Sequence, residues 1–160
     1  ILKPLIHHLE SPMTGPRTRD LGATLLRISL GTVFLAHGLY LKVFVFTLPG
    51  TAQFFGSLGL PPMLAYAVFL AETLGGLALL LGVHTRWVAA ALVPVALGAT
   101  WAHLGAGWLF SNAGGGWEYP LFLTLTLVVQ ALIGDGAWAL RPSRRHTPTQ
   151  PVRGREPQTV

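Results

Sequence analysis

Apolar residues along this chain fall into four long runs, which are separated by short polar, glycine-rich or proline-containing segments. The runs cover residues 21–46, 63–83, 87–108 and 119–133, with residue 140 as an alternative end of the last run. About 20 mostly apolar residues suffice for a helix to cross the hydrocarbon layer of a bilayer. The pattern therefore predicts an all-α fold, an integral membrane four-helix transmembrane bundle.

These runs make up one membrane domain, residues 21–140, flanked by two tails. Residues 1–20 are expected to form a flexible cytoplasmic tail, in which Met13 is a natural start, and residues 141–160 a basic disordered cytoplasmic tail. The segment 47–60 is amphipathic and is expected to lie in the outer interface or to fold over the mouth of the bundle. Close contact between helices is predicted by small residues within the first two runs, namely Gly31, Gly38, Gly75 and Gly76.

Composition agrees with a membrane protein and excludes several other classes. Of the 160 residues, 51% are hydrophobic and 11% are charged, whereas about 25% are charged in ordinary soluble domains. The arginines after Leu140 lie among Pro, Thr and Gln, which is typical of a segment beside an anionic membrane surface, so nucleic-acid binding is not expected. The absence of cysteine excludes disulfides, thiolate catalysis and thiolate metal sites.

The positions of Lys and Arg predict the direction of the chain, because cytoplasmic segments are enriched in these residues. Lys3, Arg17 and Arg19 precede the first run, Arg86 lies between the second and third runs, and an arginine-rich tail follows the fourth. The segments 47–62 and 109–118 contain neither residue type. We therefore expect a multi-pass protein of the cell (cytoplasmic) membrane, with both termini in the cytoplasm.

Two ionisable residues in the first two runs predict an ion pair inside the bundle. A charge at mid-bilayer is costly, so it usually faces the bundle interior, pairs with another charge or takes part in chemistry. Arg27 lies about 9 Å from the cytoplasmic end of the first helix, and Glu72 lies near the middle of the second run. The reach of an arginine side chain allows an Arg27–Glu72 pair. We expect a structural clamp between two helices, with proton transfer by Glu72 as the alternative.

A second set of polar residues is expected on the outer side of the bundle. It consists of His37, Lys42, His103, Asn112, Glu118 and Tyr119. On the first helix, Arg27, His37 and Lys42 fit within an arc of about 140° at 3.6 residues per turn, so one helix face can aim all three inward. This outer cluster is the candidate cofactor site, and the sequence assigns a catalytic role to no residue.

Several occupants of the outer cluster compete. Hydrogen-bonded packing is the plainest explanation of a membrane histidine. A metal site of His37, His103 and a carboxylate has suitable ligand types, but no HxxH, HxxxH or ExxH spacing lies within a helix, so no metal is expected. Bis-histidine haem is favoured less than a metal. A quinone ring held by histidine and tyrosine donors fits the mixture of aromatic and titratable groups best, and quinone is the expected cofactor.

Several segments resemble the DoxX family of four-helix membrane proteins. Residues 25–38 and 47–61 are similar to its first helix and the segment that follows, residues 71–76 to its second helix and residues 81–86 to the next turn. His103 lies where the third helix of the family carries a histidine, and residues 112–120 resemble the motif that opens the fourth. The order and spacing of these motifs over residues 21–140 carry the resemblance.

One position departs from the family pattern, which has a lysine four residues after the histidine. His37 and Lys42 are five residues apart, so the lysine is expected to be rotated by about 100° around the helix.

The resemblance implies a redox-linked membrane subunit. The family name derives from the small subunit of a thiosulfate:quinone oxidoreductase, and some relatives are linked to membrane assemblies that handle oxidative stress and thiols. We expect a small subunit of a membrane oxidoreductase system that engages quinone or a redox partner; its expected partners are the lipid bilayer, redox-enzyme subunits and further copies of itself. The alternatives are a non-enzymatic scaffold that anchors soluble redox enzymes, and a small-solute transporter, which would have to oligomerise.

Overall fold

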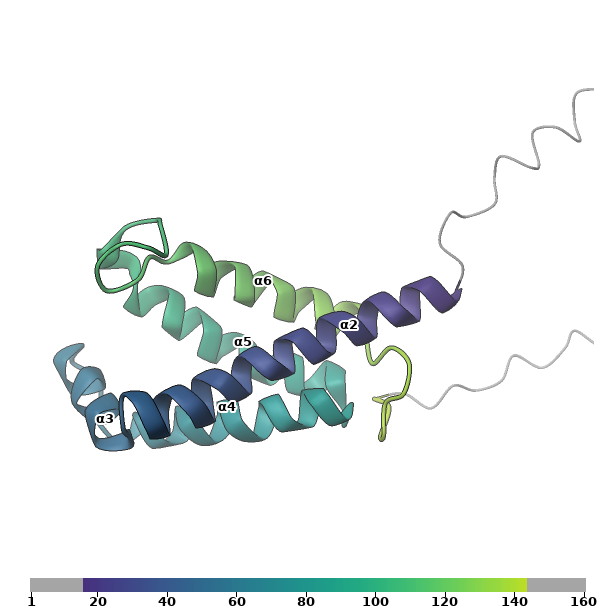
Figure 1. Cartoon of the computed structure of the whole chain (residues 1–160), viewed down its shortest axis with the longest axis horizontal. Helices are drawn as coiled ribbons and strands as arrows, with labels where there is room; N and C mark the ends of the chain where they lie inside the picture. Colours follow the sequence, from purple (N-terminus) through teal and green to yellow (C-terminus); the bar gives the residue numbers. More distant parts are fainter. Residues whose placement is uncertain (1–15, 144–160) are drawn as a thin grey trace, which may run out of the picture.

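A computed structural model describes residues 16–143, and this part of the chain is helical throughout, apart from connecting segments (Figure 1). Its elements are α2 (Pro16–Leu35), the π-helix η1 (Ala36–Val45), α3 (Leu48–Ser57), α4 (Leu64–Leu81), α5 (Thr85–Ala102), the 3-10 helix η2 (Leu104–Ala106) and α6 (Glu118–Ile133). Within residues 16–143 the only extended pairing is an isolated bridge between Val83 and Arg141. The predicted all-α fold is confirmed.

The helix ends differ from the predicted ones in three places. The chain is already helical from Pro16, within the segment that was predicted as an N-terminal tail. The third long helix ends at Ala102, because the chain turns into η2 after His103. It is therefore shorter than the predicted run, which extended to residue 108. The fourth ends at Ile133 because Gly134 adopts a φ of 94°, so the alternative end at residue 140 is wrong. The rest of both expected tails lies outside the described residues.

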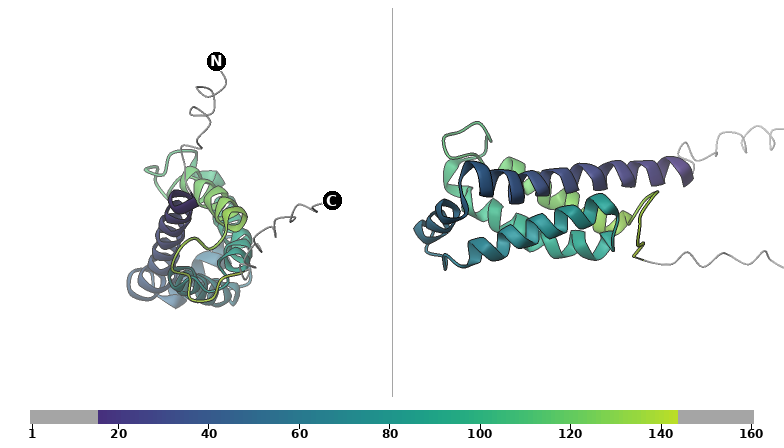
Figure 2. Two further views of the ribbon diagram at one scale, coloured as in Figure 1. Left: turned by 90° about the vertical axis from the view of Figure 1, so that its right-hand side faces the viewer. Right: turned by 60° about the horizontal axis from the view of Figure 1, so that its bottom comes forward.

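The four long helices form an elongated bundle (Figures 1 and 2). In it α2 packs on α4 and α6, and α5 packs on α4 and α6. Apolar side chains from all four helices fill the middle of the bundle, namely Leu30, Phe34, Leu79, Ala89, Leu92, Ala96 and Leu127.

Glycines set the spacing between α2–η1 and α4. A Cβ atom placed on Gly31 would lie 2.9 Å from the carbonyl oxygen of Gly76, and one on Gly76 would lie 2.8 Å from the backbone nitrogen of Leu35. Further along, a Cβ atom on Gly38 would lie 2.9 Å from the backbone nitrogen of Thr73. Real Cβ atoms essentially never come so close. The predicted close helix contact through these glycines is confirmed.

The exterior of the bundle is apolar, and several polar side chains are inside. Two helices, Arg17–Val45 and Leu64–Leu81, are long and apolar enough to cross a membrane, and only 22% of each apolar window is buried. Large apolar side chains such as Leu74, Leu97 and Phe122 are exposed along the helices. Buried polar side chains include Arg27, Glu72 and Gln130. The exterior therefore exposes more large apolar side chains than the surface of a soluble monomer usually does.

Residues 134–143, here called the strap, cross one end of the bundle, as the left view of Figure 2 shows. We call this the strap end, and the opposite end, which carries α3 and residues 103–117, the loop end (Figure 1). The backbone N–H of Arg141 donates to the Gly82 carbonyl at 3.0 Å, and the N–H of His84 donates to the Arg141 carbonyl at 2.8 Å. The strap is therefore hydrogen-bonded to the turn between α4 and α5.

Asp135 anchors the strap to the first turn of α5. Its Oδ1 atom accepts hydrogen bonds from the backbone N–H of Thr85 at 3.1 Å and from the hydroxyl of Ser143 at 2.8 Å. Its Oδ2 atom accepts from the backbone N–H of Ser143 at 2.9 Å. A carboxylate here satisfies backbone donors that the helix leaves unpaired and complements the helix dipole.

Candidate functional site

Glu72 forms an ion pair with Lys42, and not with Arg27 as the sequence analysis predicted. The Lys42 Nζ atom lies 2.5 Å from Oε2 of Glu72. The two side chains are only 13% and 10% exposed, and they come from η1 and α4. The predicted Arg27–Glu72 pair is therefore wrong: the charge pair of this helix interface lies closer to the loop end.

Arg27 instead ties α2 to the strap. Its side chain is 2% exposed, and its Nη2 atom donates to the Ala137 carbonyl at 3.2 Å, as the Thr24 hydroxyl does at 3.0 Å. The guanidinium also packs directly against Gly82, where a Cβ atom would overlap it. Arg27 thus has a structural role, as expected, but its partner is the Ala137 carbonyl of the strap in place of Glu72.

The π-helix explains why Lys42 faces inward. In η1 the hydrogen bonds join residues five apart instead of four, so positions i and i+5 come to the same side of the helix. The Lys42 Nζ atom accordingly lies 3.5 Å from the carbonyl oxygen of His37. The five-residue spacing was expected to rotate Lys42 by about 100° from the position that a lysine four residues after the histidine would occupy. That expectation is wrong, because the wider helical turn absorbs the extra residue.

The His37 side chain lies against Tyr119 across the bundle. Its Nδ1 atom is 2.9 Å from the Val33 carbonyl, which fixes the ring and makes Nδ1 the protonated nitrogen of the neutral imidazole. The His37 and Tyr119 rings are stacked, with centroids 6.2 Å apart and planes at 22°. The structure thus brings together two predicted site residues that are 82 positions apart in the sequence, and leaves Nε2 of His37 for another partner.

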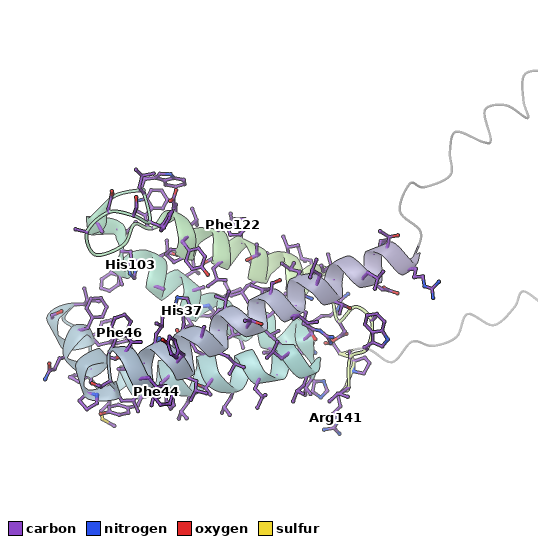
Figure 3. The ribbon with its side chains drawn as sticks, in the orientation of Figure 1. His37, Phe44, Phe46, His103, Phe122 and Arg141 are labelled. Atoms are coloured by element: carbon purple, nitrogen blue, oxygen red, sulfur yellow. The ribbon has the colours of Figure 1, made fainter. Side chains whose placement is uncertain are left out.

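His103 caps the end of α5 at the loop end. Its Nδ1 atom is 2.8 Å from the Ala99 carbonyl, so it has the same tautomer as His37. Its ring lies beside Gly115, where a Cβ atom would come within 3.3 Å of the His103 Cδ2 atom. Figure 3 shows His37 and His103 in the same half of the molecule, far from Arg141 at the strap end.

Two of the predicted site residues hold the loop between α5 and α6. The Glu118 Oε1 atom accepts a hydrogen bond from the backbone N–H of Phe110 at 2.9 Å. The Asn112 side-chain amide donates to the Ala106 carbonyl at 2.9 Å. Both residues lie at the predicted end of the bundle, and in this structure their polar atoms fold the loop back on itself.

A groove beside α6 was missed by the sequence reasoning. It has a volume of about 430 Å³ and is lined by Trp108, Phe110, Glu118, Tyr119, Leu121, Phe122 and Leu125. The signal was present in the sequence, because Tyr119, Phe122 and Leu125 recur every third residue and so follow one stripe of the helix. Two of its polar groups, Glu118 and Tyr119, lie at the loop end of that stripe.

Metal binding gains no support from the geometry. Within residues 16–143 no group of three or more His, Asp or Glu side chains is close enough to hold a metal ion.

Two of three comparisons with known proteins found a match. The family model described as DoxX matches residues 22–105, which include His37, Lys42, Glu72 and His103. A relative from Bacillus subtilis, named "Putative oxidoreductase CatD", is 35% identical over 123 residues, which cover 77% of this chain and 87% of the relative. No solved structure matches the chain. The match covers more than half of the chain, and the chain belongs to the DoxX family.

Proposed function

We propose that the chain is a four-helix membrane protein in which α2–η1, α4, α5 and α6 all cross the cell membrane. The apolar exterior of the bundle supports this proposal, because exposed leucine and phenylalanine along the helices would meet lipid at no cost. The shorter helix α6 is also apolar. At about 1.5 Å per residue, its 16 residues span roughly 24 Å, which is close to the thickness of a hydrocarbon layer.

The distribution of tryptophan and tyrosine supports the same proposal. The chain has five tryptophans and three tyrosines. Trp87 and Trp138 belong to the strap end, and the other six belong to the loop end, namely Tyr40, Tyr66, Trp101, Trp108, Trp117 and Tyr119. Such residues concentrate at the two interfaces of a membrane, where their rings lie at the level of the head groups.

We further propose that the protein is a small subunit of a membrane oxidoreductase system and that it engages a quinone at the loop end. The observation that carries this proposal is the His37–Tyr119 ring pair, which lies in the same helix bundle as the Lys42–Glu72 ion pair. An ionisable pair inside a membrane domain is by default a functional candidate. The Tyr119 hydroxyl can donate a hydrogen bond to a carbonyl of a quinone ring, and the Nε2 atom of neutral His37 can accept one from a hydroxyl of the reduced quinol. A relative that carries the word oxidoreductase in its name is consistent with this chemistry.

Binding of a quinone analogue to the purified full chain tests the proposal. We expect His37→Asn to weaken binding about tenfold or more, because a hydrogen-bonding and stacking partner is lost. The matched control is His84→Asn, which changes an exposed histidine in the turn between α4 and α5 at the strap end and should leave the affinity unchanged. Equal affinity of all three proteins, or no binding by any of them, would contradict the proposed quinone site.

A non-enzymatic scaffold is the second candidate. The observation in its favour is that Glu118 and Asn112 are used in folding the loop, as they would be in a protein without a ligand. A scaffold would lose its soluble redox partners when residues 144–160 are deleted and would keep them in His37→Asn. This deletion leaves the strap intact, because the strap ends at Ser143.

A further inference from the structure

The helices are held together more tightly at the strap end than at the loop end. The strap contacts α2 through Thr24 and Arg27, the end of α4 through Leu81, and α5 through Thr85. Towards the loop end, η1 packs on α2, α3 and α4, but it makes no extensive contact with α5 or α6. Figure 1 accordingly shows the α5–α6 pair and the α3–α4 pair apart at that end.

The His37–Tyr119 ring pair bridges these two groups of helices. His37 belongs to η1 and Tyr119 to the first turn of α6, and their ring centroids are 6.2 Å apart. A stacked contact of this kind contributes only about 1 kcal/mol beyond its buried area, so it is a weak link compared with the hydrogen bonds of the strap. Between these two groups of helices, the contacts at the loop end are therefore weaker than those at the strap end.

The groove on α6 leads to the same tyrosine. From Tyr119 the stripe continues to Phe122 and Leu125, whose side chains are 64% and 56% exposed on the outside of the bundle. Glu118, the charged residue among those lining the groove, already accepts the N–H of Phe110. The groove therefore offers an apolar surface and suits the hydrocarbon part of a ligand, not a second polar group.

We propose that Tyr119 joins these features into one ligand route with two subsites. The polar head group of the ligand passes sideways between η1 and α6 and reaches His37, while a long apolar tail stays in the groove along Phe122 and Leu125. This inference rests on the proposed quinone function and specifies the ligand as a quinone with an isoprenoid tail, delivered from the lipid and not from water.

The test compares two quinones that share one ring, one with a long isoprenoid tail and one without a tail. Dissociation constants are measured on the full chain in micelles for the wild type and for Phe122→Ala/Leu125→Ala. We expect the double variant to bind the tailed quinone about tenfold more weakly and the tail-less quinone as the wild type does. Leu132→Ala is the matched control, because Leu132 is 70% exposed on the same helix but lies towards the strap end. It should bind both quinones normally, and His37→Asn should lose affinity for both.

The possible results separate this inference from the proposed function. If the wild type binds both quinones and the groove variant binds each as the wild type does, the quinone site stands and the tail groove is wrong. If the groove variant loses affinity for both quinones equally, the groove is not a separate subsite and the inference is again wrong. If phospholipid displaces the tailed quinone from the wild type and not from the groove variant, the groove binds lipid acyl chains in general. The inference of a specific site for the quinone tail is then wrong. If the wild type binds neither quinone, both proposals fail.

Discussion

The Lys42–Glu72 ion pair gives the sharpest prediction at the scale of single residues. Because both side chains are nearly buried, removing one charge leaves the other without its partner, which typically costs about 3–5 kcal/mol. We expect Lys42→Met and Glu72→Met each to lower the free energy of unfolding by about that amount. The double variant Lys42→Met/Glu72→Met should recover most of the loss, since well-packed apolar residues can replace a buried pair. Titration with a denaturing detergent measures these differences.

Arg17→Met is the control for that series, because Arg17 is exposed at the start of α2. Its unfolding free energy should stay within about 0.5 kcal/mol of the wild type. Simple addition of the two single losses in the double variant would show that Lys42 and Glu72 do not interact. The same double variant also distinguishes a structural role of the pair from a role in ligand binding. If its stability is normal but its affinity for quinone is lost, the ion pair acts on the ligand.

The choice of partner for Glu72 could not be made from the sequence. The rarity of charges in the apolar runs predicted that Glu72 would have a cationic partner, and the long reach of an arginine side chain then favoured Arg27. The structure differs because η1 has a wider turn and directs Lys42 towards α4. A π-helix depends on packing against neighbours such as Thr73 at Gly38, and hydropathy carries no signal of it.

At the scale of elements, the strap and the α5–α6 loop each depend on one acidic side chain that accepts backbone N–H groups. Asp135 binds Thr85 and Ser143 at the strap end, and Glu118 binds Phe110 at the loop end. Asp135→Ala should speed amide hydrogen exchange in the turn between α4 and α5 and in the strap, because a cap of this kind is worth about 1–2 kcal/mol. Exchange followed by mass spectrometry on residues 82–86 and 134–143 measures the effect.

Glu118→Ala is the matched control, and it should speed exchange in residues 103–117 and leave the strap unchanged. Faster exchange of the whole bundle in Asp135→Ala would mean that the strap is not a separate unit. The sequence marked Glu118 as a ligand candidate and gave Asp135 no role, because partners 50 residues apart, such as Thr85 and Asp135, meet only once the chain has folded.

At the scale of the whole molecule, two polar regions lie on either side of an apolar core. Lys42, Glu72 and His37 lie towards the loop end, whereas Arg27 and Thr24 contact the strap. Leu30, Phe34 and Leu79 fill the space between them. Solute transport needs a polar path through the membrane. Within residues 16–143, the apolar core separates the two polar regions and so leaves no continuous polar path between them. This arrangement suits the proposed ligand site at one end of the bundle better than the transporter alternative.

The number of long helices and the apolar exterior of the bundle were predictable, because both follow from long runs of apolar residues. The position of Arg86 in the turn before α5 and the absence of Lys and Arg from residues 47–62 and 109–118 further predict that the strap end faces the cytoplasm. The bundle geometry is the same in either direction, so this orientation needs its own experiment.

Because the chain contains no cysteine, single introduced cysteines can report the orientation without background. Ser57→Cys places a thiol at the exposed end of α3, and Arg17→Cys places one at the exposed start of α2. A thiol reagent that cannot cross membranes should label Ser57→Cys in intact cells, and Arg17→Cys only after the cells are opened. The reverse labelling pattern would show the opposite membrane orientation, with the His37–Tyr119 pair on the cytoplasmic side. Labelling of both positions in intact cells would contradict a membrane-spanning bundle, because α2–η1 would then not separate them.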